Sequence, residues 1–296
     1  MISFANALEM AITDLQKPII SKFEIFYLAL QISKNGSYDG EPIRAQKVAF
    51  SIEKNSNLIR TLLEKRFISK DVDFQSYYKI NSEAGGNCDE VCCMVDPFCY
   101  LSHLSAMQKY GLTNRIPELV ILTTPEAKLW NQMRMDLEKK YQSKSNLLDE
   151  QIFSPNLKKA VFPEVVRKMK VKLVESKFIH PSIKMRDSHA RISEIGYTFL
   201  DMLINPELCG GMAHIIEVWK ENTKNYLNEI IEAVDKHPQG ITKCRAGYII
   251  DEILKVQDNK VNKWLEFAQR GGSRLLDPNS PYAPRFSEKW MISINV

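Results

Sequence analysis

The residues best suited to do chemistry are polar side chains between residues 44 and 70. Asparagine and arginine can hydrogen-bond the edges of DNA bases, and arginine, serine and threonine can bind phosphates. Leu58, Leu62 and Leu63 predict a helix whose inner face is apolar, so its polar residues point outward. The segment is therefore predicted to bind DNA, with protein binding as the alternative. The candidate residues are Arg44, Lys47, Asn55, Ser56, Asn57, Arg60, Thr61, Lys65 and Lys70.

A second group of candidates lies in a basic block in the middle of the chain. Residues 128–186 have 14 basic and 6 acidic side chains, whereas the whole chain has a net charge of only +4. A local surplus of positive charge is typical of a surface that binds a polyanion, and equally of a solvated lysine-rich face. The candidates, which we expect to form one surface patch, are Lys158, Lys159, Arg167, Lys168, Lys170 and Lys172.

Four of the six cysteines lie close together in the chain. A zinc site commonly takes its ligands from pairs spaced C-x2-C or C-x4-C. The spacing here is C-x3-C-C-x5-C, so separate pairs are not evident, and Val91 and Phe98 make the surroundings apolar. We therefore expect buried, reduced thiols, with a metal site as the alternative. The four residues are Cys88, Cys92, Cys93 and Cys99.

Ser102 and His103 are the residue types of a nucleophile and its general base. Such catalysis needs the hydroxyl within hydrogen-bond reach of the imidazole. Neighbouring residues on a helix point about 100° apart and do not face each other. We therefore expect that Ser102 and His103 do not pair and that this segment serves helix packing.

Glu175 and Lys177 lie two residues apart on an expected strand, in the E-x-K form of metal-dependent nucleases. In that chemistry a further carboxylate, here Glu164 or Asp149, completes a magnesium site, and the lysine polarises the scissile phosphate. A salt bridge on one strand face is the simpler explanation. We expect no cofactor and no metal, and we predict that the chain is not an enzyme. A nuclease, or a scaffold that binds protein, is the alternative function.

The candidate DNA contacts depend on the elements that position them. Apolar residues at helical spacing, turn residues and caps define these elements. Either Asn55 or Ser56 is expected to cap the third helix, and residues 71–75 form the turn of a hairpin. Three short helices followed by a β-hairpin is the layout of a winged helix-turn-helix domain. The expected elements are helices over Lys22–Ile32, Pro42–Ile52 and Asn57–Arg66 and strands over Phe67–Lys70 and Ser76–Ile80.

The rest of the chain predicts a larger domain of mixed helices and strands. The polar, glycine-containing segment Glu83–Asn87 is typical of a linker. We therefore predict a helix-rich α/β fold with an N-terminal winged helix-turn-helix domain in residues 1–85 and a C-terminal α/β domain in residues 86–296. The expected later elements are a helix over Pro97–Tyr110 capped by Asp96, a strand over Leu119–Thr123, a helix over Pro125–Lys144, strands over Val171–Ile179 and Arg191–Ile195, and a largely helical region from Tyr197 to about Ala268.

Composition excludes several classes of protein. Hydrophobic residues make up 44% of the chain, which is enough for a sizeable core. No apolar run reaches the ~18–20 residues that a membrane-spanning helix needs. The first residues lack the basic segment of a secretory signal. We therefore expect a cytoplasmic protein with no membrane partner.

Three stretches together resemble one family. The first is Y-L-S-x-x-S-A-M from Tyr100, followed by Y-G-L-T from Tyr110. The second is D-M-L-I-N-P-E-L-C-G-G from Asp201, and the third extends from Gln269 to Ser287. The chain is similar in these stretches to the AbiEi-like antitoxins of type IV toxin–antitoxin systems, over roughly residues 20–296.

The resemblance implies a fold and a function. It implies a winged helix that binds operator or promoter DNA and represses the protein's own operon. It also implies a C-terminal antitoxin domain that counteracts a nucleotidyltransferase toxin without forming a stable complex, in phage defence by abortive infection. The glycine usual in the wing is absent between Phe67 and Tyr78, which weakens the case for base contacts by the wing.

Overall fold

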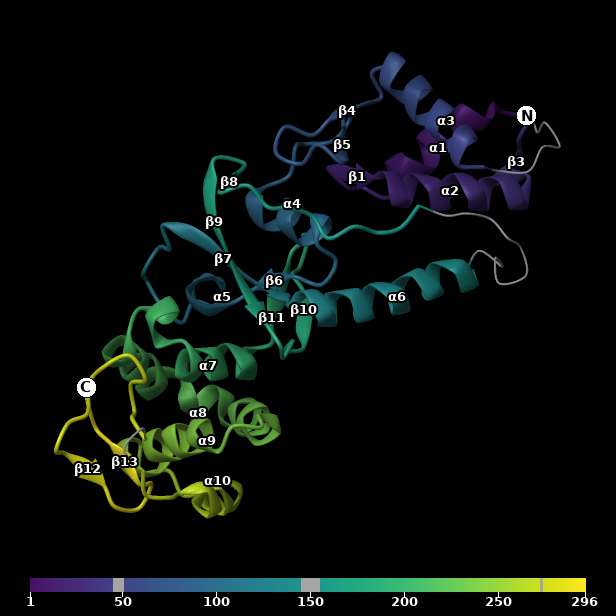
Figure 1. Ribbon diagram of the computed structural model, residues 1–296. Coiled ribbons are helices and arrows are strands. Elements are labelled where there is room, and N and C mark those ends of the chain that lie inside the picture. The colour runs from purple at the N-terminus through teal and green to yellow at the C-terminus, as the bar shows by residue number, and fades with distance from the viewer. Residues whose placement is uncertain (45–50, 145–154, 272–273) are drawn as a thin grey trace.

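The computed structural model describes residues 1–44, 51–144, 155–271 and 274–296. Figure 1 shows an elongated molecule with a helical unit at the N-terminal end, a sheet in the middle and a second helical unit at the C-terminal end. The fold is of mixed α/β class and rich in helix, as predicted. Among the described residues, no helix combines the length and the hydropathy needed to span a bilayer.

The N-terminal unit consists of three helices and a three-stranded antiparallel sheet in the order β1-β5-β4. Serine side chains cap all three helices, and at α2 Ser21 and Glu24 form a reciprocal capping box. Gly36, at φ 65°, ends α2. The elements are α1 (Phe4–Asp14), β1 (Ile19–Ser21), α2 (Lys22–Asn35), β2 (Ser37–Tyr38), β3 (Glu41–Pro42), α3 (Ile52–Glu64), β4 (Ile68–Lys70) and β5 (Tyr77–Ile80).

Two of the three predicted N-terminal helices differ from those observed. The first observed helix, α1, was not predicted, and it buries Leu8 and Ile12 against α2. No helix covers Pro42, which pairs in β3, while residues 45–50 lie outside the described residues. The predicted third helix begins five residues earlier than expected, at Ile52, because Ser51 is its cap.

A mixed six-stranded sheet in the order β10-β11-β6-β7-β9-β8 forms the middle of the molecule. Its longest strands, β7 and β9, are neighbours and pair in parallel, with Val120 opposite Val171 and Leu122 opposite Leu173. These four side chains pack beneath α4 in one hydrophobic cluster. The elements are α4 (Cys88–Val95), β6 (Tyr100–Leu101), α5 (His103–Lys109), β7 (Leu119–Pro125), α6 (Ala127–Lys144), β8 (Val165–Val166), β9 (Met169–Ser176), β10 (Ser182–Lys184) and β11 (Arg191–Ser193).

The predicted helix over Pro97–Tyr110 is wrong. Asp96 ends α4 instead of capping a following helix, and the chain then forms strand β6 before α5 begins. The reason is tertiary: the buried carboxylate of Asp96 accepts hydrogen bonds from Thr124 (2.5 Å) and from the indole of Trp130 (3.0 Å). Those partners are distant in sequence, so local spacing could not indicate them.

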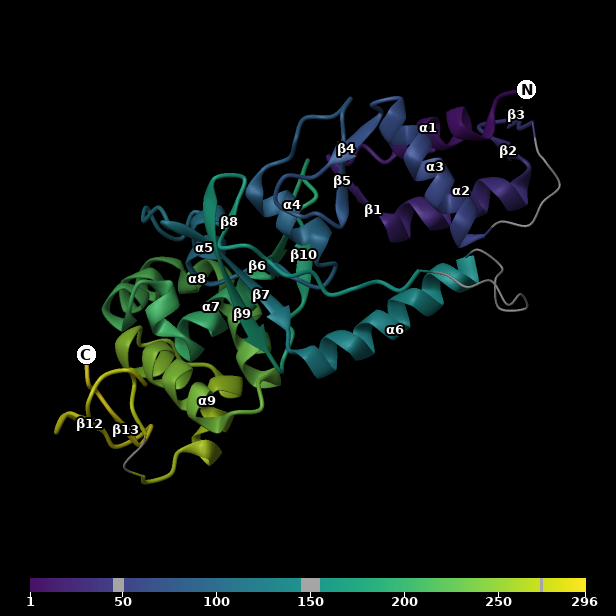
Figure 2. The same ribbon diagram turned by 45° about the horizontal axis from the view of Figure 1, so that its top comes forward.

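Helix α6 joins the N-terminal unit to the sheet. Tyr141 near its end packs its ring against Phe23 and Tyr27 of α2, with centroids 5.0 and 5.1 Å apart. Trp130 and Leu157 belong to the same hydrophobic cluster as α1, α2 and α3, which we call the N-terminal core. Figures 1 and 2 both place α6 alongside α2. The N-terminal core therefore includes side chains from both sides of residue 85.

The C-terminal unit is largely helical from Ile195 to Phe267, as predicted for the region from Tyr197 to about Ala268. Its core contains Trp219 and Trp290. Helices α7 and α8 approach closely at Gly196, where an added Cβ would lie 2.1 Å from the carbonyl oxygen of Glu229. The elements are α7 (Ile195–Ile204), η1 (Pro206–Cys209), α8 (Met212–Lys236), α9 (Gly240–Gly247), η2 (Tyr248–Ile253), α10 (Asn259–Lys263), η3 (Trp264–Phe267), β12 (Phe286–Ser287) and β13 (Ile292–Ser293).

Candidate nucleic-acid interface

Asn55 is not a surface residue, contrary to its prediction as a DNA contact. It lies on the buried stripe of α3 with Ile59 and Leu62, at spacings of four and seven residues. Because the helix begins at Ile52, position 55 points into the core. Within the part of the chain that the structure describes, its buried Oδ1 atom has no hydrogen-bond partner.

The outer face of α3 presents the side chains that were predicted to contact DNA. Ser56, Asn57 and Arg60 are exposed, and Thr61 is half-buried. The Arg60 guanidinium is 70% exposed and donates to Asn57 Oδ1 at 3.2 Å. The hydroxyls of Ser56 and Thr61 donate to carbonyls one turn earlier in the helix. Asn57 and Arg60 are therefore the groups on this face best placed to hydrogen-bond an external partner.

The other candidates of this region differ in availability. Arg44 is exposed. Lys65 is already in an ion pair, because its ammonium lies 2.7 Å from the carboxylate of Glu9 on α1. Lys70 lies 4.6 Å from the centroid of an aromatic ring of β5. Lys47 lies outside the described residues.

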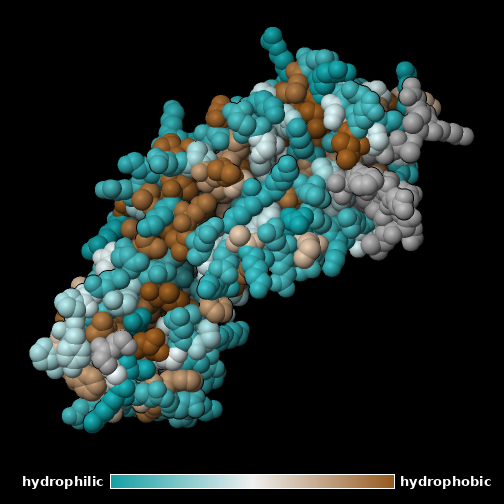
Figure 3. Space-filling model, in the orientation of Figure 1, coloured by the Kyte–Doolittle hydropathy of each residue, from teal (hydrophilic) through white to brown (hydrophobic). Residues whose placement is uncertain are grey.

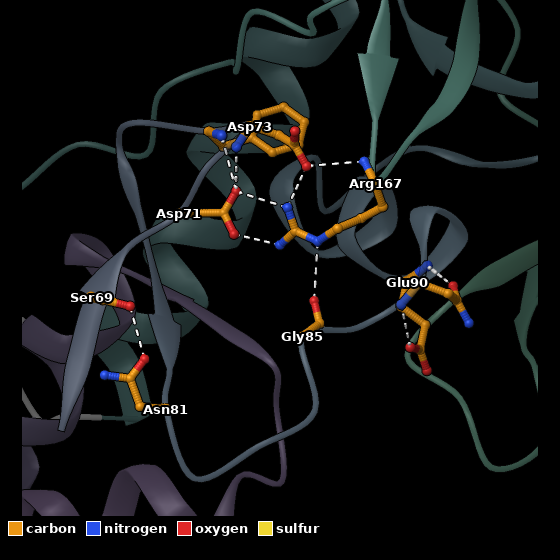
Figure 4. A network of polar contacts seen from close by, with 9 residues as sticks. Ser69, Asp71, Asp73, Asn81, Gly85, Glu90 and Arg167 are labelled. Carbon is orange, nitrogen blue, oxygen red and sulfur yellow. Dashed lines mark hydrogen bonds and ion pairs between the residues drawn. The ribbon is translucent and has the colours of Figure 1, made fainter. Parts of the chain in front are cut away.

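Arg167 is an internal ion-pair partner and not a free cation for DNA. Its guanidinium binds both carboxylates of the β4–β5 turn, Asp71 and Asp73, and its Nε donates to the carbonyl of Gly85 at 3.1 Å. Figure 4 shows the guanidinium enclosed by these groups. Burial lowers the pKa of Arg167, but the hydrogen bonds and charges of the two aspartates outweigh burial and raise it above its usual value. We call this contact the wing clasp.

The predicted contacts in the rest of the basic block differ in whether they already form an ion pair within the chain. Lys159 binds Glu175 at 2.8 Å and the carbonyl of Pro125 at 3.2 Å. The partner of Glu175 is thus Lys159 and not Lys177, the residue suggested by the E-x-K pattern, and Asp149 lies outside the described residues. Four of the predicted contacts in the block are exposed and form no ion pair among the described residues: Lys158, Lys168, Lys170 and Lys172.

Hydrophobic side chains also reach the surface beside these lysines. Val165 and Met169, on either side of the β8–β9 turn, are 45% and 41% exposed. Figure 3 shows hydrophilic residues over most of this face of the molecule and a hydrophobic area over β8, β9 and α5. The lysines of the hairpin therefore border an apolar surface.

Ser102 and His103 do pair, which corrects the prediction from helix geometry. Ser102 precedes α5 in an extended conformation, and His103 has a positive φ of 51°, so the two side chains converge. His103 Nδ1 lies 2.8 Å from Ser102 Oγ, which also accepts from Thr123 at 2.8 Å. His103 Nε2 lies 3.1 Å from the amide nitrogen of Asn205. Both side chains are buried, and the prediction that they do not pair is wrong.

A second polar group lies beside this pair at the base of α7. His180 Nε2 is 3.3 Å from Asp201 Oδ1, and the His180 ring stacks on Tyr197 with centroids 4.9 Å apart. Burial lowers the pKa of His103, against an opposing effect of the Asp201 charge. The motifs that begin at Tyr100 and at Asp201 therefore meet in space, a proximity that sequence spacing alone did not indicate.

The four clustered cysteines are buried free thiols. Cys88 Sγ lies 3.9 Å from Cys92 Sγ, one helical turn away on α4. The backbone N–H of Arg191 donates to Cys93 Sγ at 3.3 Å. No set of three or more potential metal ligands comes together in the described ranges. These contacts attach α4 to strand β11.

An open hollow of about 390 Å³ lies where α5 ends and α8 begins. Thr113, Arg115, His214 and Glu217 line it. Thr113 Oγ1 lies 3.0 Å from His214 Nε2, and burial, with the charge of Arg115, lowers the pKa of His214. Sequence analysis did not single out this hollow, because its residues come from segments about 100 positions apart.

Comparison with known proteins identifies no family for the chain. No family model matches the chain, and no curated protein matches it. Among solved structures, the chain is similar to the crystal structure of the RV2827C protein from Mycobacterium tuberculosis. The similarity covers 98% of this chain and 90% of that one, with 10% sequence identity and a TM-score of 0.48.

Proposed function

We propose that the chain is a DNA-binding transcriptional autorepressor and the antitoxin of a type IV toxin–antitoxin system. The observation that carries the DNA-binding part is the exposed pair Asn57 and Arg60 on α3, hydrogen-bonded to each other at 3.2 Å. Arginine and asparagine are the residues that most often make bidentate contacts with guanine and adenine in the major groove. Because they lie one turn apart on a rigid helix, they can face adjacent base pairs.

The arrangement around α3 supports the same proposal. The N-terminal unit has the element order α1–β1–α2–β2–β3–α3–β4–β5, with β1, β4 and β5 in one antiparallel sheet. Apart from the short β2–β3 pair between α2 and α3, this is the order of a winged helix-turn-helix, in which the third helix enters the major groove and the β4–β5 turn is the wing. Helix α3 buries Ile59 and Leu62 and therefore holds a fixed face toward solvent.

The antitoxin part of the proposal rests on the resemblance of the three sequence stretches. Two of them, from Tyr100 and from Asp201, lie at one place in the fold, where His103 contacts Asn205. Residues that recur together in a motif and pack together in space suit a structural role in a shared domain. We propose that this domain counteracts a nucleotidyltransferase toxin and needs no cofactor.

DNA binding is tested with the purified full-length chain and two duplexes of equal length. One duplex is the DNA upstream of the chain's own gene, and the other is an unrelated sequence. The proposal predicts tighter binding to the upstream DNA and a linear fall of log K with log salt concentration. Equal affinity for the two duplexes would reject specific repression.

The antitoxin part needs a separate test. The chain is co-expressed with a nucleotidyltransferase encoded next to it, and growth and co-purification are measured together. The proposal predicts restored growth without a stable complex. Persistent toxicity in the presence of the folded chain would reject the antitoxin role and leave the DNA-binding proposal to stand on its own test.

A further inference from the structure

The turn between β4 and β5 has the wrong charge for a phosphate contact on its own. It contains two aspartates, Asp71 and Asp73, and with Lys70 at the end of β4 the tip of this hairpin has a net charge of −1. Phosphates repel such a surface. In a winged helix the turn at this position normally approaches the DNA backbone, so the charge has to be compensated from elsewhere.

The β8–β9 hairpin supplies that compensation. Its turn consists of Arg167 and Lys168, and the wing clasp places it directly on the β4–β5 turn. The backbone N–H of Arg167 also donates to Asp73 Oδ2 at 3.0 Å, so main chain and side chain both hold the contact. With Arg167 and Lys168 included, the combined surface has a net charge of +1.

The backbone of the hairpin turn is unfavourable for these two residues. Arg167 has φ 49° and Lys168 has φ 68°, as in a two-residue type I′ turn. Such turns prefer Asn-Gly, because side chains with a Cβ lose free energy at positive φ. Residues kept in strained conformations commonly serve a function. Arg167 has such a function in the wing clasp, whereas the Lys168 side chain is exposed and has no ion pair among the described residues.

We propose that the β8–β9 turn completes the wing: Arg167 pairs with its two carboxylates and, together with Lys70, balances their charge, and Lys168 binds a phosphate of the DNA that α3 contacts. This inference rests on the proposed DNA binding and locates part of it outside the first 85 residues. Lys168 follows the clasp residue Arg167 directly in the chain, so its backbone lies next to the β4–β5 turn and its exposed side chain starts there. The positive charge that the β4–β5 turn lacks is therefore provided by a segment about 95 residues away.

The experiment measures salt dependence with the full-length chain and the duplex upstream of its gene. Lys168→Ala is compared with the wild type and with the control Lys184→Ala, an exposed lysine on edge strand β10 of the same sheet. The inference predicts that the slope of log K against log salt falls by about one for Lys168→Ala and is unchanged for Lys184→Ala. Lys168→Gly should show the same loss, although glycine suits the positive φ and should retain or improve the fold.

The outcomes separate the two proposals. If the wild type binds and both Lys168 variants keep its slope, the completed wing is wrong and the DNA-binding proposal stands. If Lys184→Ala lowers the slope as much as Lys168→Ala, the effect is one of total charge, and the assignment to Lys168 is also wrong. If the wild type shows no preference for the upstream DNA, the proposed function itself fails.

Discussion

Arg167 and Asp71 are 96 residues apart in the chain, and their ion pair is buried on both sides, with side chains 15% and 1% exposed. Removing one partner of such a pair leaves an uncompensated charge and typically costs about 3–5 kcal/mol. The clasp therefore fixes the β4–β5 turn relative to the six-stranded sheet. Under the proposed function, DNA bound along α3 and the β4–β5 turn would meet a surface built from both parts of the chain.

Asp96 is predicted to be one of the residues most important for stability. Its carboxylate, buried to 1% exposure, accepts from Thr124, Trp130 and the backbone of Phe98. Asp96→Ala would leave those donors unsatisfied and should lower the free energy of unfolding by about 3 kcal/mol. The control Asp136→Ala, on the exposed side of α6, should change it by less than about 0.5 kcal/mol. Urea unfolding followed by circular dichroism measures both, and similar values for the two variants would contradict the prediction.

Stability should fall as the pH drops below about 6.5, partly because of His103. Burial holds the pKa of His103 below its usual value of about 6.5, so below that pH the unfolded state binds a proton that the folded state does not. The folded state is then disfavoured by up to about 1.4 kcal/mol per pH unit for this group. His103→Asn keeps a residue that tolerates positive φ and should flatten the dependence between pH 7 and pH 5.5. A variant with the wild-type dependence would show that His103 is not the responsible group.

The boundary at residue 85 remains a prediction, and the N-terminal core suggests how to test it. Trp130, Tyr141 and Leu157 pack against the N-terminal helices, so a fragment of residues 86–296 would expose them to water. We expect this fragment to keep its helical circular dichroism, to bind a hydrophobic dye and to self-associate. A monomeric fragment that binds no dye would show that the two units have independent cores.

Much of the fold could be predicted because its signals are local. The capping serine and apolar spacing of α2, the hairpin β4–β5, the apolar strand β7 and the glycine and proline breaks after Tyr197 are all visible within short windows. Predictions failed where a distant partner decides the outcome. In sequence Asp96 resembles a helix cap, but in the structure its carboxylate accepts a hydrogen bond from Trp130. Likewise Arg167 resembles a surface cation, but it forms an ion pair with Asp71.

The candidate site was predicted correctly where local helical spacing decides exposure and wrongly where it does not. Asn57 and Arg60 are exposed as their helical spacing indicated. Asn55 is buried because α3 begins at Ile52, after its cap Ser51, whereas the cap was predicted at Asn55 or Ser56. The pairing of Ser102 with His103 depends on a positive φ at a non-glycine residue, which helical geometry does not include.

The contribution of α3 to specific DNA binding is tested most directly by one substitution on its exposed face. Binding of wild-type, Arg60→Ala and Arg186→Ala chains to the upstream duplex and to unrelated DNA is measured by fluorescence anisotropy at one salt concentration. Arg186, 94% exposed beside the β10–β11 connection, is the control arginine. We predict that Arg60→Ala loses about 1–3 kcal/mol on the upstream duplex and much less on unrelated DNA, while Arg186→Ala binds as the wild type does. Wild-type affinity of Arg60→Ala for the upstream duplex would contradict base recognition by α3.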